Sequence, residues 1–204
     1  MGLKILITIA LILISYLYGS IPFALVIGKL FYKKDIRTEG SGNLGGTNAG
    51  RVLGAKAGVS VIVLDASKTI VSMLLTLFIT QNFGISSDIV YLSALACIIG
   101  HCYPIFAGFR GGKAVSVAIG YAIFVNIWAG LFGLLVFFIV LKLTKYVSLS
   151  SISGTAGVLI ISPFLGFSGI GIFTNAFILA LMTYKHKDNI IRLKEGTERK
   201  ITWM

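Results

Sequence analysis

The residues best suited to chemistry stand in one polar segment, residues 40–51, which reads GSGNLGGTNAGR. Its glycines allow positive φ angles and a close approach of ligand to backbone, and successive amide N–H groups in such segments bind anions. Arg51 can hold a phosphate with two parallel hydrogen bonds. A flexible hinge is the alternative, but a hinge requires neither asparagine nor arginine, so we expect phosphate binding. The candidate residues are Ser41, Gly42, Asn43, Thr47, Asn48 and Arg51.

Two helix starts are expected beside these donors. Thr47 or Asn48 can cap the helix that follows the polar segment, and a helix N-terminus favours an anion. Lys113 follows two glycines in the sequence FRGGKAV, at the start of a short helix. This sequence is not a P-loop, because Ala107 replaces its first glycine and Ala114 stands where serine or threonine is required. We therefore expect Lys113 to meet an anion and infer no nucleotide. The alternative is a lysine that extends along the membrane surface.

Asp65 and Lys68 are ionisable residues inside an apolar segment. They are three residues apart and so share a helix face, and ionisable groups at such depth normally point into the helix bundle and are paired. The pattern leaves two interpretations open: a structural ion pair, or a pair that lines the site. His101 and His186 are expected near the cytoplasmic boundary. Neither has an aspartate five residues later, so the His-x4-Asp acyltransferase motif is absent.

Metal and covalent chemistry are not indicated by the sequence. The chain has only seven acidic residues, and no membrane-facing pair of carboxylates is placed to hold Mg²⁺ between diphosphate oxygens. Cys97 and Cys102 lack metal-ligand spacing, and we expect both to be inert. We therefore expect no metal and no cofactor, and a site that works with lysine, arginine, backbone amides and small hydroxyls.

The elements that must position these residues are membrane helices. The chain has 204 residues, is 56% hydrophobic and has a mean hydropathy of +0.94, values typical of a polytopic membrane protein. Its net charge of +11 would suggest nucleic acid in a soluble protein. Here the basic residues stand beside apolar segments, a pattern typical of cytoplasmic loops. The expected partners are therefore the lipid bilayer and anionic substrates, and not nucleic acid.

The apolar segments predict the topology. They are 5–28, 57–83, 89–107, 114–141, 147–167 and 169–184. The first lacks a cleavage site and is expected to be a retained helix. The basic loops can all be cytoplasmic only if 114–141 crosses twice, with a turn near Asn126. The sequence thus predicts one all-α polytopic domain over 1–204. It has seven transmembrane helices, two of them short (about 114–125 and 127–141), an external N-terminus and a cytoplasmic C-terminus. The four polar loops then share the cytoplasmic face.

Five motifs occur in order along the chain. They are GSIPFA at 19–24, GSGNLGGTNAGR at 40–51, LDASK at 64–68, GHCYPIFAGFRGGKAV at 100–115 and YKHKDNIIRLKEGTE at 184–198. Together they resemble the PlsY family, the bacterial acyl-phosphate:glycerol-3-phosphate acyltransferases. The resemblance implies a seven-helix enzyme of the bacterial cytoplasmic (inner) membrane with a cytoplasmic active site. It implies acyl transfer from acyl phosphate to the 1-hydroxyl of glycerol 3-phosphate without an acyl-enzyme, giving lysophosphatidate and inorganic phosphate. The soluble acyl-phosphate-forming enzyme, PlsX, is an expected partner.

The resemblance also implies roles for individual residues. The catalytic candidates are Lys113, Arg51 and Ser41; Gly42, Asn43, Thr47 and Asn48 complete the phosphate-binding segment; Ser148, Ser151, His186 and Asn189 are expected to help hold glycerol 3-phosphate; and Asp65, Lys68 and His101 are candidates for lining the site. Two stretches depart from the family pattern. Thr69 stands where the family usually has glycine, and Ala114, Val115, Ser116 and Val117 stand where it prefers Gly-Val-Ala-Thr.

Two other classes of protein fit parts of the pattern. A transporter for a small anionic metabolite would also use short helices and anion-binding loops. A structural membrane protein would not account for four polar loops on one face. Release of phosphate from acyl phosphate in the presence of glycerol 3-phosphate separates the enzyme from the transporter.

Overall fold

The computed structural model describes residues 1–201, which fall into two compact units. The first unit is Met1–Tyr121, and the second begins at Ala122. All regular elements within residues 1–201 are helical. The motifs are therefore divided between the units: segments 40–51 and 109–115 belong to the first, and the segment from residue 184 belongs to the second.

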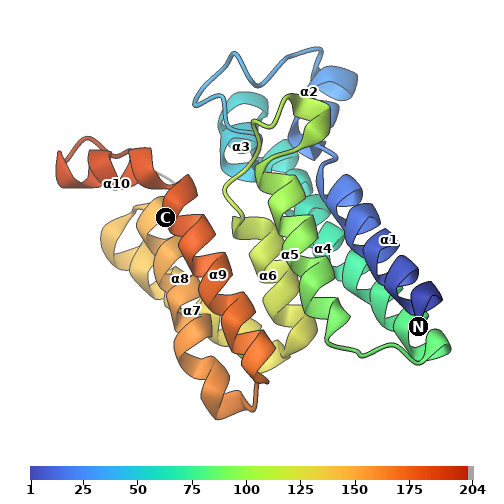
Figure 1. Ribbon diagram of the computed structural model, residues 1–204. Helices are drawn as coiled ribbons and strands as arrows, with labels where there is room; N and C mark the ends of the chain where they lie inside the picture. Colours follow the sequence, from blue (N-terminus) through green and yellow to red (C-terminus); the bar gives the residue numbers. More distant parts are fainter. Residues whose placement is uncertain (202–204) are drawn as a thin grey trace. The chain divides into compact units, whose positions relative to one another are not determined.

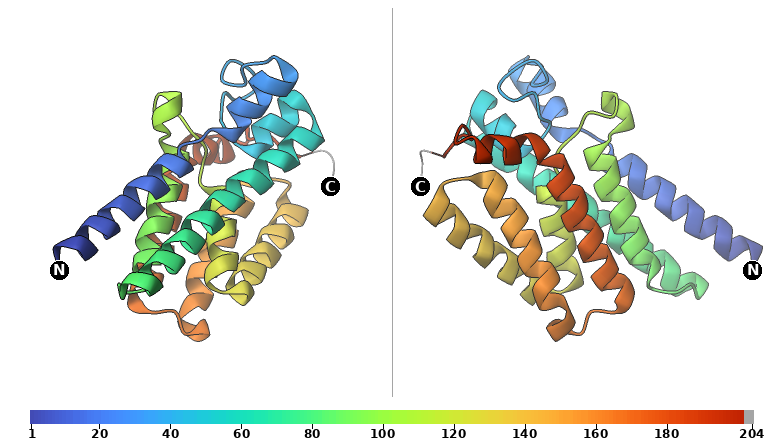
Figure 2. Two further views of the ribbon diagram at one scale, coloured as in Figure 1. Left: turned by 90° about the vertical axis from the view of Figure 1, so that its right-hand side faces the viewer. Right: turned by 60° about the vertical axis from the view of Figure 1, so that its left-hand side comes forward.

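The first unit is built around helices α1, α4 and α5 (Figures 1 and 2). Helices α1 and α4 both pack against α5, and the short helix α3 packs against α4. Helix α6 begins in this unit, where Gly120 lies against the backbone of Ala66 in α4. The bounds are α1 Gly2–Gly19, α2 Phe23–Tyr32, α3 Gly46–Leu53, α4 Ala55–Phe83, α5 Ile89–Cys102, the 3₁₀ turn η1 Ile105–Ala107, and α6 Val115–Val125.

The second unit is a helical hairpin with a third helix beside it. Helix α7 packs against α8, and α8 packs against α9. The short helix α10 contacts the ends of α8 and α9. The bounds are α7 Ile127–Thr144, α8 Val147–Ile161, the 3₁₀ turn η2 Ser162–Leu165, α9 Gly169–Lys185 and α10 Lys187–Lys194.

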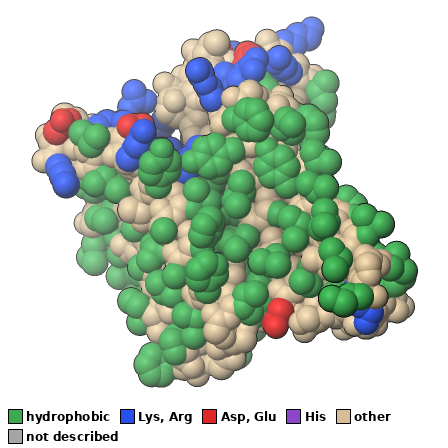
Figure 3. Space-filling view, in the orientation of Figure 1, with side chains coloured by type: hydrophobic (Ala, Val, Ile, Leu, Met, Phe, Trp, Pro, Cys, Tyr) green, Lys and Arg blue, Asp and Glu red, His purple; other side chains and the backbone are tan. Residues whose placement is uncertain are grey.

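Five helical segments in residues 1–201 are long and apolar enough to cross a membrane. They are Gly2–Gly19, Ala55–Phe83, Ile89–Ala107, Ile127–Thr144 and Val147–Leu165. Large hydrophobic side chains are exposed along their flanks, as lipid contact requires. Figure 3 shows these hydrophobic flanks, and it shows Lys and Arg gathered in the first unit at the end that carries α2 and α3.

The N-terminal apolar segment is two helices and not the single helix predicted over 5–28. Helix α1 ends at Gly19, and α2 begins at Phe23. Pro22 is the reason, because proline has no N–H to continue the helix and its ring disfavours the helical conformation at the preceding residue. The second helix ends at Tyr32, and its C-cap, Lys33, has a left-handed conformation with φ 54°.

The predicted turn at Asn126 is confirmed, although its two helices are not both short. The Asn126 side-chain oxygen accepts hydrogen bonds from the N–H groups of Trp128 at 3.0 Å and Ala129 at 3.2 Å, and so caps α7. Helix α6 has 11 residues, but α7 has 18 and runs to Thr144. At about 1.5 Å per residue α7 is about 27 Å long, close to the thickness of a bilayer core.

Candidate active site

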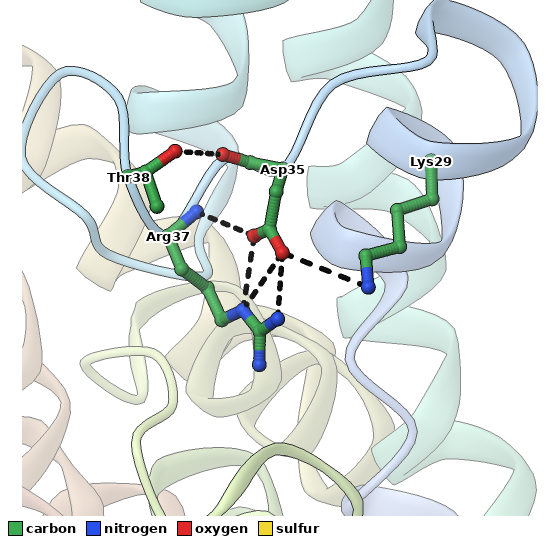
Figure 4. Close-up of polar contacts among 4 residues, drawn as sticks. All are labelled: Lys29, Asp35, Arg37 and Thr38. Atoms are coloured by element: carbon green, nitrogen blue, oxygen red, sulfur yellow. Dashed lines mark hydrogen bonds and ion pairs between the residues drawn. The ribbon is translucent and has the colours of Figure 1, made fainter.

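The loop that precedes the polar segment 40–51 contains its own ion pairs. The Asp35 carboxylate accepts hydrogen bonds from the Arg37 guanidinium, the shortest at 2.6 Å, and lies 3.6 Å from Lys29 Nζ (Figure 4). The Thr38 hydroxyl donates to the Asp35 carbonyl at 3.0 Å. The hydrogen bond from Arg37 holds the pKa of Asp35 well below its usual range. The charge of Arg37 is therefore already matched within the loop.

The polar segment folds around the side chain of Asn48, which is 2% exposed. Its oxygen accepts the N–H of Ser41 at 2.8 Å. Its nitrogen donates to the carbonyls of Ile36 at 3.3 Å and Glu39 at 3.2 Å. One buried amide thus joins the chain that enters the segment, residues 36–41, to Asn48 in helix α3. The segment needs glycine at Gly40, because φ there is 64° and an added Cβ would lie 2.3 Å from the Asn48 oxygen.

The predicted cap by Thr47 or Asn48 is wrong. Helix α3 begins at Gly46 with Gly45 as its N-cap, so both residues lie within its first turn. The reason is tertiary packing against α4. A Cβ on Gly46 would lie 2.9 Å from the Gly58 carbonyl oxygen, so the helix must begin with a residue that has no side chain.

Three donors from this segment reach the surface of the first unit. Ser41, Thr47 and Arg51 are exposed, whereas Asn48 is turned inward. Thr47 and Arg51 are one helical turn apart on α3, so their side chains share a face. The Arg51 side chain forms no hydrogen bond or ion pair with any residue between 1 and 201, in contrast to that of Arg37. An exposed arginine without a carboxylate partner is well suited to hold an anion.

The second basic segment contacts the first. The Asn43 side-chain nitrogen donates to the carbonyl of Gly111 at 3.1 Å. Gly111 and Gly112 are buried, and the partly exposed Lys113 follows them. Two segments that lie 68 residues apart in sequence are thereby joined, which places Lys113 and the residues of 40–51 at one end of the first unit.

Ala114 explains one departure from the family pattern. It is fully buried and has φ 69°, a left-handed conformation that glycine adopts more readily. Alanine is the smallest side chain that can replace glycine there, and α6 begins immediately after it at Val115.

Asp65, Lys68 and His101 lie inside the first unit. Lys68 Nζ is 2.8 Å from Asp65 Oδ1, and both side chains are 1% exposed. Lys68 also donates to the carbonyls of Gly19, at 3.2 Å, and Ile21. His101 Nδ1 is 3.6 Å from Asp65 Oδ1. The predicted pairing is confirmed, and the burial favours the structural ion pair of the two interpretations that the sequence left open.

The second unit gathers polar residues around Glu198. Its carboxylate accepts hydrogen bonds from the Ser148 hydroxyl at 2.7 Å, the Asn189 side-chain nitrogen at 2.6 Å and Arg192 Nε at 2.8 Å. Ser148 and Asn189 were predicted as site residues, whereas Glu198 and Arg192 were missed. Nothing in the sequence distinguished Glu198 from the other acidic residues of the tail, Asp188 and Glu195.

The remaining two candidates of the second unit are also buried. Ser151 is 3% exposed and donates to the Val147 carbonyl of its own helix at 2.8 Å. His186 is 4% exposed, and its Nδ1 lies 2.8 Å from the Met182 carbonyl oxygen. Because a carbonyl oxygen only accepts hydrogen bonds, the His186 ring carries a proton on Nδ1 in this contact.

Comparison with known proteins covers almost the whole chain. Residues 9–196 match the family described as glycerol-3-phosphate acyltransferase. Over 196 residues the chain is 48% identical to a glycerol-3-phosphate acyltransferase of Listeria monocytogenes, a match that covers 96% of this chain and 98% of the relative. The chain belongs to the glycerol-3-phosphate acyltransferase family. A family member of Geobacillus kaustophilus is 41% identical over 198 residues, which are 96% of this chain and 97% of the relative.

Solved structures agree with the family assignment. A crystal structure of PlsY, an integral membrane glycerol 3-phosphate acyltransferase, in its glycerol 3-phosphate form matches with a TM-score of 0.88 and 38% identity, over 96% of each chain. The lysophosphatidic acid form matches with a TM-score of 0.86, over 96% of this chain and 95% of that one. This glycerol-3-phosphate acyltransferase family member is thus a multi-pass membrane protein and an acyltransferase of phospholipid biosynthesis. The transporter alternative is not supported.

Replacement of Glu198 by glutamine is expected to lower the thermal unfolding midpoint of this family member at neutral pH. Burial raises the pKa of Glu198, but the hydrogen bonds from Asn189, Ser148 and Arg192 lower it more, so it lies below its ordinary value of 4.5. A carboxyl with a depressed folded-state pKa stabilises the protein above its unfolded pKa, and this contribution is lost as the pH falls through the folded pKa. The difference in midpoint should therefore be complete above pH 4.5 and shrink at lower pH.

Glu195→Gln is the matched control for this measurement. Glu195 is three residues away in the same tail and is exposed. Its replacement should leave the midpoint of the detergent-solubilised protein nearly unchanged at every pH. Equal midpoints for Glu198→Gln and Glu195→Gln at neutral pH would contradict a stabilising role for the Glu198 hydrogen bonds.

Proposed function

We propose that this membrane acyltransferase transfers a fatty acyl group from acyl phosphate to the 1-hydroxyl of glycerol 3-phosphate. The products are lysophosphatidate and inorganic phosphate. Support for the acceptor comes from the family name and from the glycerol 3-phosphate and lysophosphatidic acid forms of the similar PlsY structures. Support for the donor comes from the chain's motifs and from the cations and amides that the first unit gathers at one end.

The contact between Asn43 and Gly111 carries this proposal. It joins the segment that bears Arg51 to the segment that bears Lys113, so two cationic side chains and several amides belong to one polar end. Acyl transfer from acyl phosphate releases phosphate and develops negative charge on the acyl oxygen. A site with fixed donors aimed at that charge lowers the barrier, and this electrostatic contribution is usually the largest in acyl transfer.

The reaction proceeds by direct attack. Acyl phosphate is an activated mixed anhydride, so the 1-hydroxyl attacks the acyl carbonyl and no acyl-enzyme forms. Lys113, Arg51 and Ser41 stabilise the negative charge as the carbon–oxygen bond to phosphate breaks. The proton of the attacking hydroxyl passes to a phosphate oxygen of the substrate. Gly42, Asn43, Thr47 and Asn48 contribute by binding phosphate or by holding the segment that does.

The second unit binds the acceptor in this proposal. Ser148, Ser151, His186 and Asn189 are the assigned residues. The Ser148 hydroxyl and the Asn189 side-chain amide both donate hydrogen bonds to the Glu198 carboxylate. Ser148 therefore offers oxygen lone pairs, which accept hydrogen bonds from the hydroxyl groups of the glycerol part and do not suit its phosphate.

The topology belongs to the same proposal. Seven helices cross the bacterial cytoplasmic (inner) membrane: α1, α4, α5, α6, α7, α8 and α9. The N-terminus is outside, and the C-terminus and the active site are on the cytoplasmic side. This orientation is supported by the Lys and Arg residues in the loop that follows α2 and in the tail that follows α9. Soluble PlsX, which forms acyl phosphate, is the proposed source of the donor.

Phosphate release tests the proposal. Purified protein in detergent is supplied with acyl phosphate, with and without glycerol 3-phosphate, and inorganic phosphate is followed over time. The expected result is release at a rate that depends on both substrates. A protein that binds or transports these anions without catalysis would release no phosphate above the spontaneous rate, and that result would contradict the proposed function.

A further inference from the structure

Asp65, Lys68 and His101 form a buried polar cluster that the proposed mechanism does not use. Their exposed fractions are 1%, 1% and 6%. Charged groups at this depth in a membrane helix are costly and are retained where they have a task. The main-chain groups that Lys68 and His101 contact indicate what this task is.

Lys68 holds the break between α1 and α2. It donates to the carbonyls of Gly19 and Ile21, which stand where α1 ends ahead of Pro22. The last carbonyls of a helix lack intrahelical partners, and a cation there also complements the negative end of the helix dipole. Lys68 therefore fixes α4 to this break, while its ion pair keeps the Asp65 carboxylate in place at 2.8 Å.

His101 lies between Asp65 and the glycines that precede Lys113. One ring nitrogen, Nδ1, is 3.6 Å from Asp65 Oδ1. At the other, Nε2, a Cβ built on Gly112 would lie only 2.0 Å away, so the ring abuts the backbone of Gly112. The Gly112 N–H also donates to the His101 carbonyl at 3.0 Å. Gly112, in the chain that leads to Lys113, therefore contacts both the ring and the main-chain carbonyl of His101.

We propose that Asp65 and His101 are positioning residues for Lys113. The carboxylate orients the imidazole, the imidazole fixes Gly112, and Gly112 sets the path of the chain into Lys113. Metal-ligating histidines are commonly oriented by a carboxylate, whose loss typically costs about 10–100-fold in activity, and we expect a loss of the same order for this histidine. This inference rests on the proposed role of Lys113 in acyl transfer.

Kinetic coupling with Lys113 tests the proposal. His101→Gln and Asp65→Asn are made in the wild-type chain and in the Lys113→Arg variant, and kcat and KM are measured for each. In the wild-type chain each is expected to lower kcat about 10–100-fold, with KM for glycerol 3-phosphate changed less than about threefold. In Lys113→Arg, whose side chain is already misplaced, the same substitutions should cost less than about threefold. Equal losses in both backgrounds would overturn the proposal.

Hydrogen exchange gives a readout that does not depend on activity. In detergent, the peptide that covers residues 109–115 should exchange faster in His101→Gln and Asp65→Asn than in the wild type. Ser93→Ala is the matched control, because Ser93 is also buried in α5 and accepts a hydrogen bond from Thr76 in α4 at 2.8 Å. It should leave exchange of 109–115 unchanged. Unchanged exchange in both test variants, or the same increase in the control, would overturn the proposal.

The two readouts separate this inference from the proposed function. If the wild-type protein releases no phosphate from acyl phosphate, the proposed function fails, and the exchange of residues 109–115 still decides whether His101 fixes that segment. If the wild-type protein is active and the exchange and coupling results are negative, only the positioning role of Asp65 and His101 fails.

Discussion

Replacement of Lys113 by alanine is expected to lower kcat by about 10²–10³-fold, which corresponds to about 2.7–4 kcal/mol of barrier. The expected size follows from the loss of one fixed donor for the charge that develops as phosphate departs. Lys113 follows two buried glycines at the end of the first unit where Asn43 joins the two polar segments. The measurement is phosphate release by the purified variant at saturating concentrations of both substrates.

Two further variants make this result specific. Lys113→Arg keeps a cation and should lose less activity than Lys113→Ala, although its planar fork does not reproduce the ammonium position. Arg110→Ala removes a nearby exposed cation from the same segment and should change kcat less than about threefold. Normal turnover by Lys113→Ala would remove Lys113 from the mechanism.

Replacement of Arg51 by alanine is expected to lower kcat/KM by about 10²-fold. Arg51 is exposed on α3 beside Thr47 and has no ion-pair partner within residues 1–201, so its guanidinium can hold a phosphate with two hydrogen bonds. The loss should be found with both substrates present and should not be accompanied by a lower unfolding midpoint. Steady-state kinetics and thermal unfolding of the same preparation measure the two quantities.

Arg37 supplies the matched control for Arg51. It is an exposed arginine of the loop that precedes α3, but its guanidinium donates a hydrogen bond to the Asp35 carboxylate at 2.6 Å. Arg37→Ala should therefore change kcat/KM less than about threefold, since an exposed ion pair contributes little. Equal losses for Arg37→Ala and Arg51→Ala would indicate a general effect of surface charge and would contradict a specific role for Arg51.

The breaks between helices show what the sequence could predict. The turn at Asn126 was predictable, because the basic loops could all be cytoplasmic only if the apolar segment 114–141 crossed the membrane and returned. The break at Pro22 was missed, because the apolar run continues through it and hydropathy does not record a lost N–H. Proline itself was the signal, and it separates α1 from α2.

The start of α3 could not be predicted from local preferences. Thr47 and Asn48 are both good N-cap residues, yet the helix begins earlier, at Gly46. The close packing of Gly46 against Gly58 of α4 sets the start of the helix. These two residues are brought together only by the tertiary fold. Asn48 is then released from capping and becomes the buried centre of the polar segment.

The contacts of the ionisable residues were also predictable only in part. The three-residue spacing of Asp65 and Lys68 predicted their ion pair, which the structure confirms at 2.8 Å. Nothing in the spacing indicated that His101 would join them, because it lies on another helix. Glu198 was missed for a similar reason: its partners Ser148 and Asn189 are 50 and nine residues away in sequence.

The identity of the acyl donor is the most direct test of the account. Purified protein is incubated with glycerol 3-phosphate and either acyl phosphate or acyl-CoA of the same chain length, and lysophosphatidate is measured by mass spectrometry. The proposed function predicts that acyl phosphate gives lysophosphatidate and an equal amount of inorganic phosphate, and that acyl-CoA gives no lysophosphatidate. Lysophosphatidate formed from acyl-CoA alone, or none formed from acyl phosphate, would contradict it.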